Sequence, residues 1–193
     1  MKQRSIILLL FITACSTTKY KNPHVAIETK YGTIEIEVLI EQAPKTGAAF
    51  LSYVDSGYYK RSSFYRVLND QNQPSNAPKS ELIQGGIWKT NYNLAKSIPG
   101  IEHEPTNKTN ILHKNGVVSI ARAEPGTAGA EFFICVGDQP GFDFGGVNNA
   151  DGLGYAAFGR VVKGMNVVTE IYNAKEYDQA LDPPVVIFDI KRL

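Results

Sequence analysis

One arginine in this chain has neighbours that suggest a chemical role. Arg66 lies in the run Phe64-Tyr65-Arg66-Val67-Leu68, whose aromatic and apolar residues predict a β-strand. Because successive side chains of a strand point to opposite faces, we expect Phe64, Arg66 and Leu68 to share one face. A guanidinium on an apolar face is typical of a site that recognises a polar group inside an apolar cleft. The alternative is an arginine that extends into water from the end of the strand.

The segments around this strand alternate between short strands and turns rich in Gly, Pro, Asn and Asp. A hairpin with one solvated face is predicted from strands 25–29 and 33–38, and further strands from residues 63–68, 81–84, 116–121, 132–136, 156–162 and 185–190. Helices are predicted over 45–54, with Pro44 in the first helical position and Ala48, Phe50, Leu51 and Val54 on the apolar face, and from 163 or 164 to about 172. Many short strands with two helices predict a mainly β protein built as a closed antiparallel barrel, because closure removes exposed edges. An open sheet capped by two helices is the alternative.

The N-terminal residues resemble a bacterial lipoprotein signal. Lys2 and Arg4 precede an apolar run over 6–12 that is too short to span a bilayer, so residues 1–14 are predicted to be a signal peptide. The run Ile12-Thr13-Ala14-Cys15 resembles a lipobox, which implies cleavage before Cys15 and a lipid anchor on that cysteine. We expect residues 15–23 to form a lipidated tether, residues 24–193 to form one domain, and the protein to face the periplasm of a bacterial cell envelope. The alternative is an ordinary signal peptide with a chance cysteine.

Charge and cysteine content narrow the function classes. Removal of residues 1–14 leaves 18 basic against 19 acidic side chains, so there is no electrostatic case for a nucleic-acid partner. Once Cys15 carries lipid, Cys135 is the only other cysteine, so the mature chain cannot form an internal disulfide. Cys135 lies in an apolar run and is predicted to be a buried, inert thiol.

Two other chemistries have little support in the sequence. His24, His103 and His113 lack a metal-ligand spacing and are predicted to lie on surface loops. Ser119 lies in an apolar strand with no base placed beside it, which argues against a hydrolase.

Five ordered blocks resemble the cyclophilin-type peptidyl-prolyl isomerases. They are Phe64-Tyr65-Arg66-Val67, Leu82-Ile83-Gln84-Gly85-Gly86, the run 116–122, Glu131-Phe132-Phe133-Ile134 and the run 158–165. The resemblance covers about residues 24–193 and implies a closed eight-stranded antiparallel barrel capped by two α-helices, with a peptide groove on its outer surface. It also implies proline-containing polypeptides as partners, no metal and no cofactor, and we presume a monomer.

The resemblance also implies roles for individual residues. Arg66 is similar to the family's catalytic arginine, and the substrate-binding positions are Leu82, Gln84, Ala121, Phe133, Phe142, Glu131 and Tyr155. Of these, Leu82, Phe133 and Phe142 are implied to form the proline pocket, and Ala121 to contact the substrate backbone. The two aromatics of Phe132-Phe133 should point to opposite faces, so only one of them is a site candidate.

The chain departs from the family pattern at several positions. Glu81, Glu131, Gly141 and Tyr155 stand where an aromatic residue, glutamine, tryptophan and histidine are usual, and residues 69–78 are an insertion. A carboxylate at Glu131 would either orient Arg66 by a bidentate pair or compete with substrate for its donors, and we favour orientation. The predicted function is a peptidyl-prolyl cis-trans isomerase for folding proteins of the cell envelope. The alternative is a peptide-binding or chaperone lipoprotein with little turnover.

Overall fold

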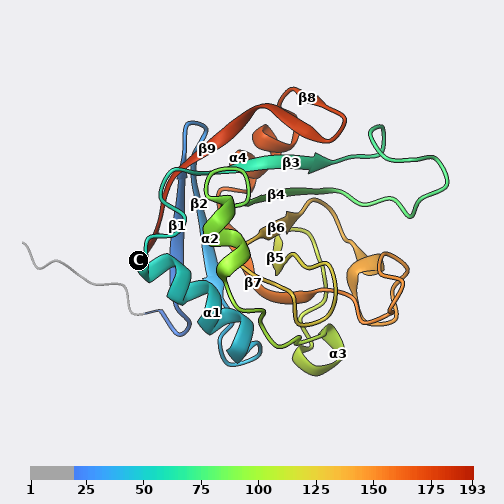
Figure 1. The fold of residues 1–193 in the computed structure, drawn as a ribbon, viewed down its shortest axis with the longest axis horizontal. Helices are drawn as coiled ribbons and strands as arrows, with labels where there is room; N and C mark the ends of the chain where they lie inside the picture. Colours follow the sequence, from blue (N-terminus) through green and yellow to red (C-terminus); the bar gives the residue numbers. More distant parts are fainter. Residues whose placement is uncertain (1–19) are drawn as a thin grey trace, which may run out of the picture.

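A computed structural model describes residues 20–193, and Figure 1 shows its fold. The predicted signal peptide and Cys15 lie outside the described residues. The strands are β1 (His24–Thr29), β2 (Gly32–Val38), β3 (Ser62–Leu68), β4 (Leu82–Gly86), β5 (Val117–Ile120), β6 (Phe132–Cys135), β7 (Ala156–Lys163), β8 (Glu176–Tyr177) and β9 (Ala180–Arg192). The helices are α1 (Pro44–Asp55), α2 (Tyr92–Ser97), α3 (Thr106–Thr109), the 3₁₀ turn η1 (Pro140–Phe142) and α4 (Met165–Tyr172). All the predicted strands and both predicted helices are present, whereas α2, α3, η1 and β8 were not predicted.

Eight strands close into a barrel. They follow one another in the order β1-β2-β7-β5-β6-β4-β3-β9, and β9 pairs back onto β1 in antiparallel register. This last pairing confirms the closed eight-stranded barrel and shows that the open-sheet alternative was wrong. The two-residue strand β8 pairs with β9 outside this ring.

Helices α1 and α4 cover different sides of the barrel, α1 at the lower left of Figure 1 and α4 at the top. Pro44 occupies the first turn of α1 as predicted. The buried face of α1 uses Gly47 in place of the predicted Ala48, which is exposed, because Gly47 lies directly against Val38 of β2. A carboxylate distant in sequence caps this helix, since Glu104 accepts hydrogen bonds from the backbone N–H and the hydroxyl of Thr46 at 2.7 and 2.8 Å.

Side chains divide between the inside of the barrel and a second apolar cluster. Phe132 is fully buried in the central core, where its ring lies 5.8 Å from that of Phe50. Its neighbour Phe133 belongs to the second cluster, together with Leu68, Leu82, Cys135 and Phe142. The prediction that Phe132 and Phe133 point to opposite faces is therefore confirmed, as is the burial of Cys135.

Two of the three histidines are buried, so their predicted place on surface loops was wrong. His24 lies in β1, and its Nδ1 is 2.8 Å from Oε1 of Glu35. Lys163 also pairs with Glu35 at 2.7 Å, so this position of the hairpin is buried despite the solvated face predicted for it. The ion pair compensates the buried charge of Glu35, whereas the alternating pattern of the strand predicts that this side chain faces water. His113 is discussed with the site.

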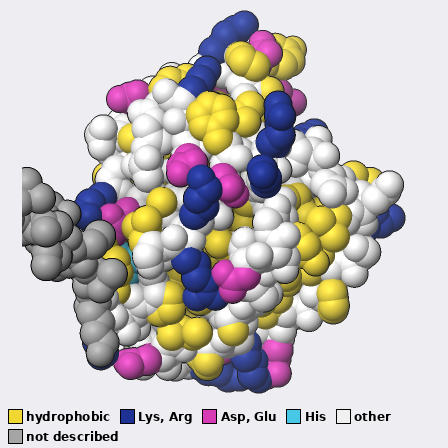
Figure 2. All heavy atoms as spheres, turned by 90° about the vertical axis from the view of Figure 1, so that its left-hand side faces the viewer, with side chains coloured by type: hydrophobic (Ala, Val, Ile, Leu, Met, Phe, Trp, Pro, Cys, Tyr) yellow, Lys and Arg dark blue, Asp and Glu magenta, His cyan; other side chains and the backbone are white. Residues whose placement is uncertain are grey.

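The C-terminal end of the predicted tether contacts the barrel. Asn22 donates a hydrogen bond to Glu37 at 2.8 Å, and the carbonyl of Pro23 accepts one from Val38 N–H at 2.8 Å. Nearby surfaces carry mixed charge: Figure 2 shows basic and acidic side chains interspersed over the left-hand face of the barrel. Within residues 20–193 no helix has the length and apolar character needed to cross a membrane.

Candidate active site

A β-bulge in β3 places two consecutive side chains, Tyr65 and Arg66, on the outer surface. In the ladder with β4, Phe64 pairs with Gly85 and Arg66 with Gln84, so two residues of β3 oppose one of β4. Phe64 is fully buried in the barrel core, whereas Tyr65 and Arg66 line an outer cavity. The prediction that Phe64 shares a face with Arg66 was wrong, because the extra residue resets the alternation of the strand.

Strand register then gathers the site residues into one row. Arg66 is the partner of Gln84, Gln84 of Phe133, and Phe133 of Ser119 across β3, β4, β6 and β5. Directly paired side chains on one face of a sheet are close enough to interact. Four segments that are distant in sequence thus form one continuous surface, and a one-residue slip in any ladder would turn its side chain into the core.

A pocket of about 220 Å³ opens at this row, with aromatic side chains on one part of its lining and polar side chains on the rest. The rings of Phe133, Phe142 and Tyr155 form its walls and meet edge to face, with all three centroid distances at 5.2 Å. Arg66, Leu82, Gln84 and Ala121 also line this pocket. Of the predicted substrate-binding residues, only Glu131 lies elsewhere, in an adjoining cavity of about 480 Å³.

Two departures from the family pattern shape this pocket. The insertion contributes Gln73 to the lining, and the Gln73 side chain is fixed by donating hydrogen bonds to the carbonyls of Asn69 and Ser80 at 2.7 and 2.8 Å. A Cβ atom at Gly141 would lie 1.8 Å from Oδ1 of Asn148, so Asn148 fills the space beside this glycine and itself lines the pocket. The rim of the pocket is therefore more polar than its walls.

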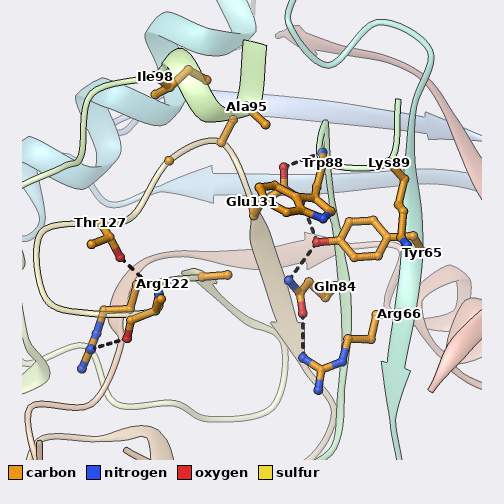
Figure 3. Close-up of a pocket in the computed structure, with 14 residues that line it drawn as sticks. Tyr65, Arg66, Gln84, Trp88, Lys89, Ala95, Ile98, Arg122, Thr127 and Glu131 are labelled. Atoms are coloured by element: carbon orange, nitrogen blue, oxygen red, sulfur yellow. Dashed lines mark hydrogen bonds between the residues drawn. The ribbon is translucent and has the colours of Figure 1, made fainter. Parts of the chain in front are cut away.

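A chain of hydrogen bonds connects the guanidinium to a carboxylate (Figure 3). Nη1 of Arg66 donates to Oε1 of Gln84 at 3.2 Å, and Nε2 of Gln84 donates to the Tyr65 hydroxyl at 2.9 Å. The hydroxyl in turn donates to Oε2 of Glu131 at 2.8 Å. Among the described side chains, Glu131 makes no ion pair with Arg66, so the bidentate pair considered above is absent. The hydrogen-bond connection from Glu131 to Arg66 runs through Tyr65 and Gln84.

Electrostatics fix the direction of this chain. Burial raises the pKa of Glu131, and hydrogen bonds from Tyr65 and from the backbone N–H groups of Ile87 and Trp88 oppose that rise. Burial and the neighbouring Glu131 charge raise the pKa of Tyr65 well above its usual range, so the phenol stays protonated. With its proton directed to Glu131, the phenol oxygen can only accept from Gln84. Gln84 must therefore present its carbonyl oxygen to Arg66.

Comparison with known proteins agrees with this geometry. Residues 24–192 match the family model described as cyclophilin type peptidyl-prolyl cis-trans isomerase. The chain belongs to this family. It is 30% identical over 198 residues to peptidyl-prolyl cis-trans isomerase A of Dickeya dadantii, covering 96% of both chains. It is 32% identical to isomerase B of Escherichia coli, covering 76% of this chain and 82% of that protein.

A solved structure shares the fold. The Cryptosporidium parvum cyclophilin type isomerase, determined in the presence of the dipeptide Ala-Pro, superposes with a TM-score of 0.66 at 24% identity. The superposition covers 87% of this chain and 97% of that one. The barrel is thus cyclophilin-like, and the family membership identifies the protein as a peptidyl-prolyl cis-trans isomerase acting on proline-containing peptides.

Beneath the pocket of the isomerase lies a buried polar triad that the sequence did not reveal. His113 Nε2 is 3.0 Å from the Ser119 hydroxyl, and His113 Nδ1 is 2.8 Å from Oδ1 of Asp143. The statement that Ser119 has no base beside it was therefore wrong. Ser119 is fully buried, so a substrate carbonyl cannot reach it and it cannot act as a hydrolytic nucleophile. The His113 ring instead lies parallel to Phe133 at 6.1 Å and supports the pocket wall.

The sequence also gave no indication of Gln179. Its Oε1 accepts hydrogen bonds from Nε and Nη2 of Arg66 at 3.1 and 2.7 Å. The two residues are 113 positions apart, and nothing in the sequence around Gln179 marks it as part of a site. Only the pairing of β3 with β9 brings Gln179 to the isomerase groove.

Proposed function

We propose that Arg66 is the catalytic residue of this isomerase and acts by stabilising the twisted peptide bond. Rotation about an X-Pro bond is slow because resonance gives the C–N bond partial double-bond character, with a barrier of about 20 kcal/mol. No covalent bond is made or broken, so catalysis requires only tighter binding of the twisted amide than of either planar form.

In the twisted amide the proline nitrogen regains its lone pair. A guanidinium N–H directed at this nitrogen gains a hydrogen bond that the planar ground states cannot accept. Three of the five N–H groups of Arg66 are bound by Gln84 and Gln179. The remaining two are on the far edge of the guanidinium and are available to the substrate.

The aromatic part of the pocket has the complementary role of holding the proline ring. Phe133, Phe142 and Tyr155 surround a pocket that also contains Arg66 in its lining, so the ring and the donor are held next to each other. Apolar walls exclude water and strengthen the hydrogen bond of Arg66. An acceleration of about 10⁵ requires roughly 7 kcal/mol of preferential binding, so pocket fit must add to one charged hydrogen bond.

The observation that carries this proposal is the position of Arg66 on the same outer face as Phe133, next to the pocket. The test is a protease-coupled assay on an Ala-Pro peptide with Arg66→Ala and Arg66→Lys. We expect Arg66→Ala to lose about a hundredfold or more in kcat/KM, and Arg66→Lys to be intermediate because lysine lacks the planar fork.

Arg160→Ala is the matched control, because Arg160 is an exposed arginine of β7 that pairs with Glu37 and does not line the pocket. Its turnover should equal that of the parent. Equal rates for Arg66→Ala and the parent would refute catalysis by Arg66.

We further propose that the isomerase is a lipoprotein anchored through Cys15 and acts on proteins folding in the bacterial cell envelope. The support is the basic and apolar composition of residues 1–14 and the lipobox-like run before Cys15. In Figure 1 the blue N-terminal end of the barrel lies at the lower left, whereas the loop between β3 and β4 that borders the pocket extends to the right. A tether at this end would leave the groove accessible to polypeptides.

Labelled palmitate and membrane fractionation test this anchor in a bacterial host. The parent should incorporate label and sediment with membranes, and Cys15→Ser should do neither. A Cys135→Ser variant controls for the other thiol and should behave as the parent. Label retained in Cys15→Ser would refute the anchor.

A further inference from the structure

The turn that carries Gln179 adopts a backbone conformation unfavourable to its sequence. Tyr177 of β8 pairs with Ala180 of β9, so Asp178 and Gln179 form a two-residue hairpin loop. Both have positive φ angles, 49° and 70°. Loops of this geometry favour Asn and Gly, because a β-carbon and a long side chain are disfavoured in the left-handed region. A glutamine held there is a local cost that the hairpin itself does not require.

Every polar group of Gln179 is engaged. Its N–H donates to Oε2 of Glu176 at 2.8 Å, and its carbonyl accepts from Val67 N–H at 2.9 Å. Its side-chain Nε2 donates to the carbonyl of Asn72 at 3.0 Å, which leaves Oε1 directed at Arg66. The amide cannot flip without placing its NH₂ group against the guanidinium. The orientation of Oε1 is therefore determined by the insertion loop and β3 together.

Oε1 of Gln179 accepts both hydrogen bonds from one edge of the Arg66 guanidinium. Nε–H and the adjacent Nη2–H of Arg66 both meet Oε1 of Gln179, while Nη1 meets Gln84 from the other side. The planar fork is thus bound on two sides, and its third edge carries the two remaining N–H groups. Both acceptors are neutral amides. They fix the fork without cancelling the positive charge that a carboxylate would neutralise.

We propose that Gln179 is a positioning residue for Arg66, kept in an unfavourable turn conformation because its side chain aims the two free N–H groups at the reacting amide. This inference rests on the proposed catalytic role of Arg66. Gln179 also connects the insertion to the guanidinium, because its side chain binds both Asn72 and Arg66. Loop 69–78 and the β8–β9 hairpin therefore position Arg66 together.

The test compares two glycine substitutions in the same turn. Gln179→Gly and Asp178→Gly both relieve an unfavourable positive φ, and melting curves verify that both variants are folded. Only Gln179→Gly removes the contact with Arg66. We expect it to lose about tenfold in the catalysed exchange rate of an Ala-Pro peptide, measured by NMR, while Asp178→Gly keeps the parental rate.

Peptide affinity separates positioning from binding. The dissociation constant of the peptide should change less than twofold in Gln179→Gly, since the pocket walls are untouched. Gln179→Glu is the second variant: its carboxylate still reaches the guanidinium but neutralises it, so turnover should also fall. Gln179→Gly as active as Asp178→Gly would overturn the proposal, as would a loss in Gln179→Gly that is due entirely to weaker peptide binding.

The Arg66→Ala variant distinguishes failure of the positioning proposal from failure of the catalytic proposal. If Arg66→Ala is inactive and Gln179→Gly is fully active, the positioning role alone fails. If Arg66→Ala keeps the parental rate, the catalytic proposal fails whatever the Gln179 variants show.

Discussion

Glu131→Gln should weaken catalysis although it removes no direct contact with Arg66. The carboxylate accepts three hydrogen bonds: Oε1 from the N–H groups of Ile87 and Trp88, both at 2.8 Å, and Oε2 from Tyr65 at 2.8 Å. In a glutamine the carbonyl oxygen must remain with the two fixed backbone donors. Its NH₂ group then faces Tyr65 and donates to the phenol oxygen.

This substitution reverses the donor–acceptor direction of the hydrogen bonds that connect residue 131 to Gln84. A phenol that accepts from residue 131 donates its proton to Gln84, which turns its own amide to present an oxygen to Tyr65. The NH₂ group of Gln84 then faces the donor Nη1 of Arg66, and the 3.2 Å hydrogen bond is lost. A hydrogen bond to a charged group contributes about 1.5 to 3 kcal/mol, so we expect a loss of about ten- to a hundredfold in kcat/KM.

A double-mutant cycle with Tyr65→Phe isolates this effect. Phenylalanine removes the hydroxyl that transmits polarity, so Glu131→Gln should cost nothing further in that background, and the two substitutions should be strongly non-additive. The assay is protease-coupled isomerisation of an Ala-Pro peptide, with melting curves to verify that each variant is folded.

Two results would refute the reasoning. One is parental or higher turnover in Glu131→Gln. The other is an equal loss from Glu131→Gln with and without the Tyr65 hydroxyl, since the effect would then not pass through the phenol.

Further predictions concern Glu131, Tyr172 and Cys135. Because the pKa of Glu131 is raised by burial, turnover of the parent should fall on the acid side with a midpoint above the ordinary carboxyl value of 4.5, and a pH–rate profile of Glu131→Gln should lack this limb. The linked effect on stability has the opposite sign, because ionisation of Glu131 is less favourable in the folded state than in the unfolded state. The protonated carboxyl therefore contributes to the free energy of unfolding below about pH 4.5, and this contribution is lost as the pH rises through the raised pKa. Urea titrations of the parent and Glu131→Gln should diverge across this pH range. Tyr172→Phe removes the 2.7 Å hydrogen bond from the Tyr172 hydroxyl in α4 to Glu81. We expect the free energy of unfolding to fall by about 1 kcal/mol with unchanged turnover, measured by urea titration and the coupled assay. Reduced turnover would show that Glu81 influences the groove. Burial raises the pKa of Cys135 far above its usual range, so mass spectrometry should find this thiol unmodified by iodoacetamide in the folded protein and alkylated in denaturant; rapid labelling without denaturant would contradict its burial.

The chain's local patterns were sufficient for the elements and for most of the site. Alternation and turn residues located each of the eight barrel strands and both long helices, because a strand or helix with one buried face leaves a period in the sequence. The ordered blocks contain Arg66, Gln84 and Phe133, and the family resemblance predicted Phe142 and Tyr155; the structure brings all five to one pocket. Arg66, Gln84 and Phe133 lie in strands that have a local sequence signature of their own.

Tertiary structure decided how these residues are oriented and supported. The bulge at Tyr65 depends on the pairing of β3 with β4, and the sequence of β3 contains no pattern that predicts it. Gln179 reaches Arg66, His113 reaches Ser119 and Glu104 caps α1 only because the barrel closes, since each pair comes from different elements. Side-chain hydrogen bonds between such elements carry no sequence period, because the partner is selected by distance in the folded chain. The sequence alone therefore predicted most of the side chains that line this pocket, and the closed barrel determined the direction in which Arg66 points.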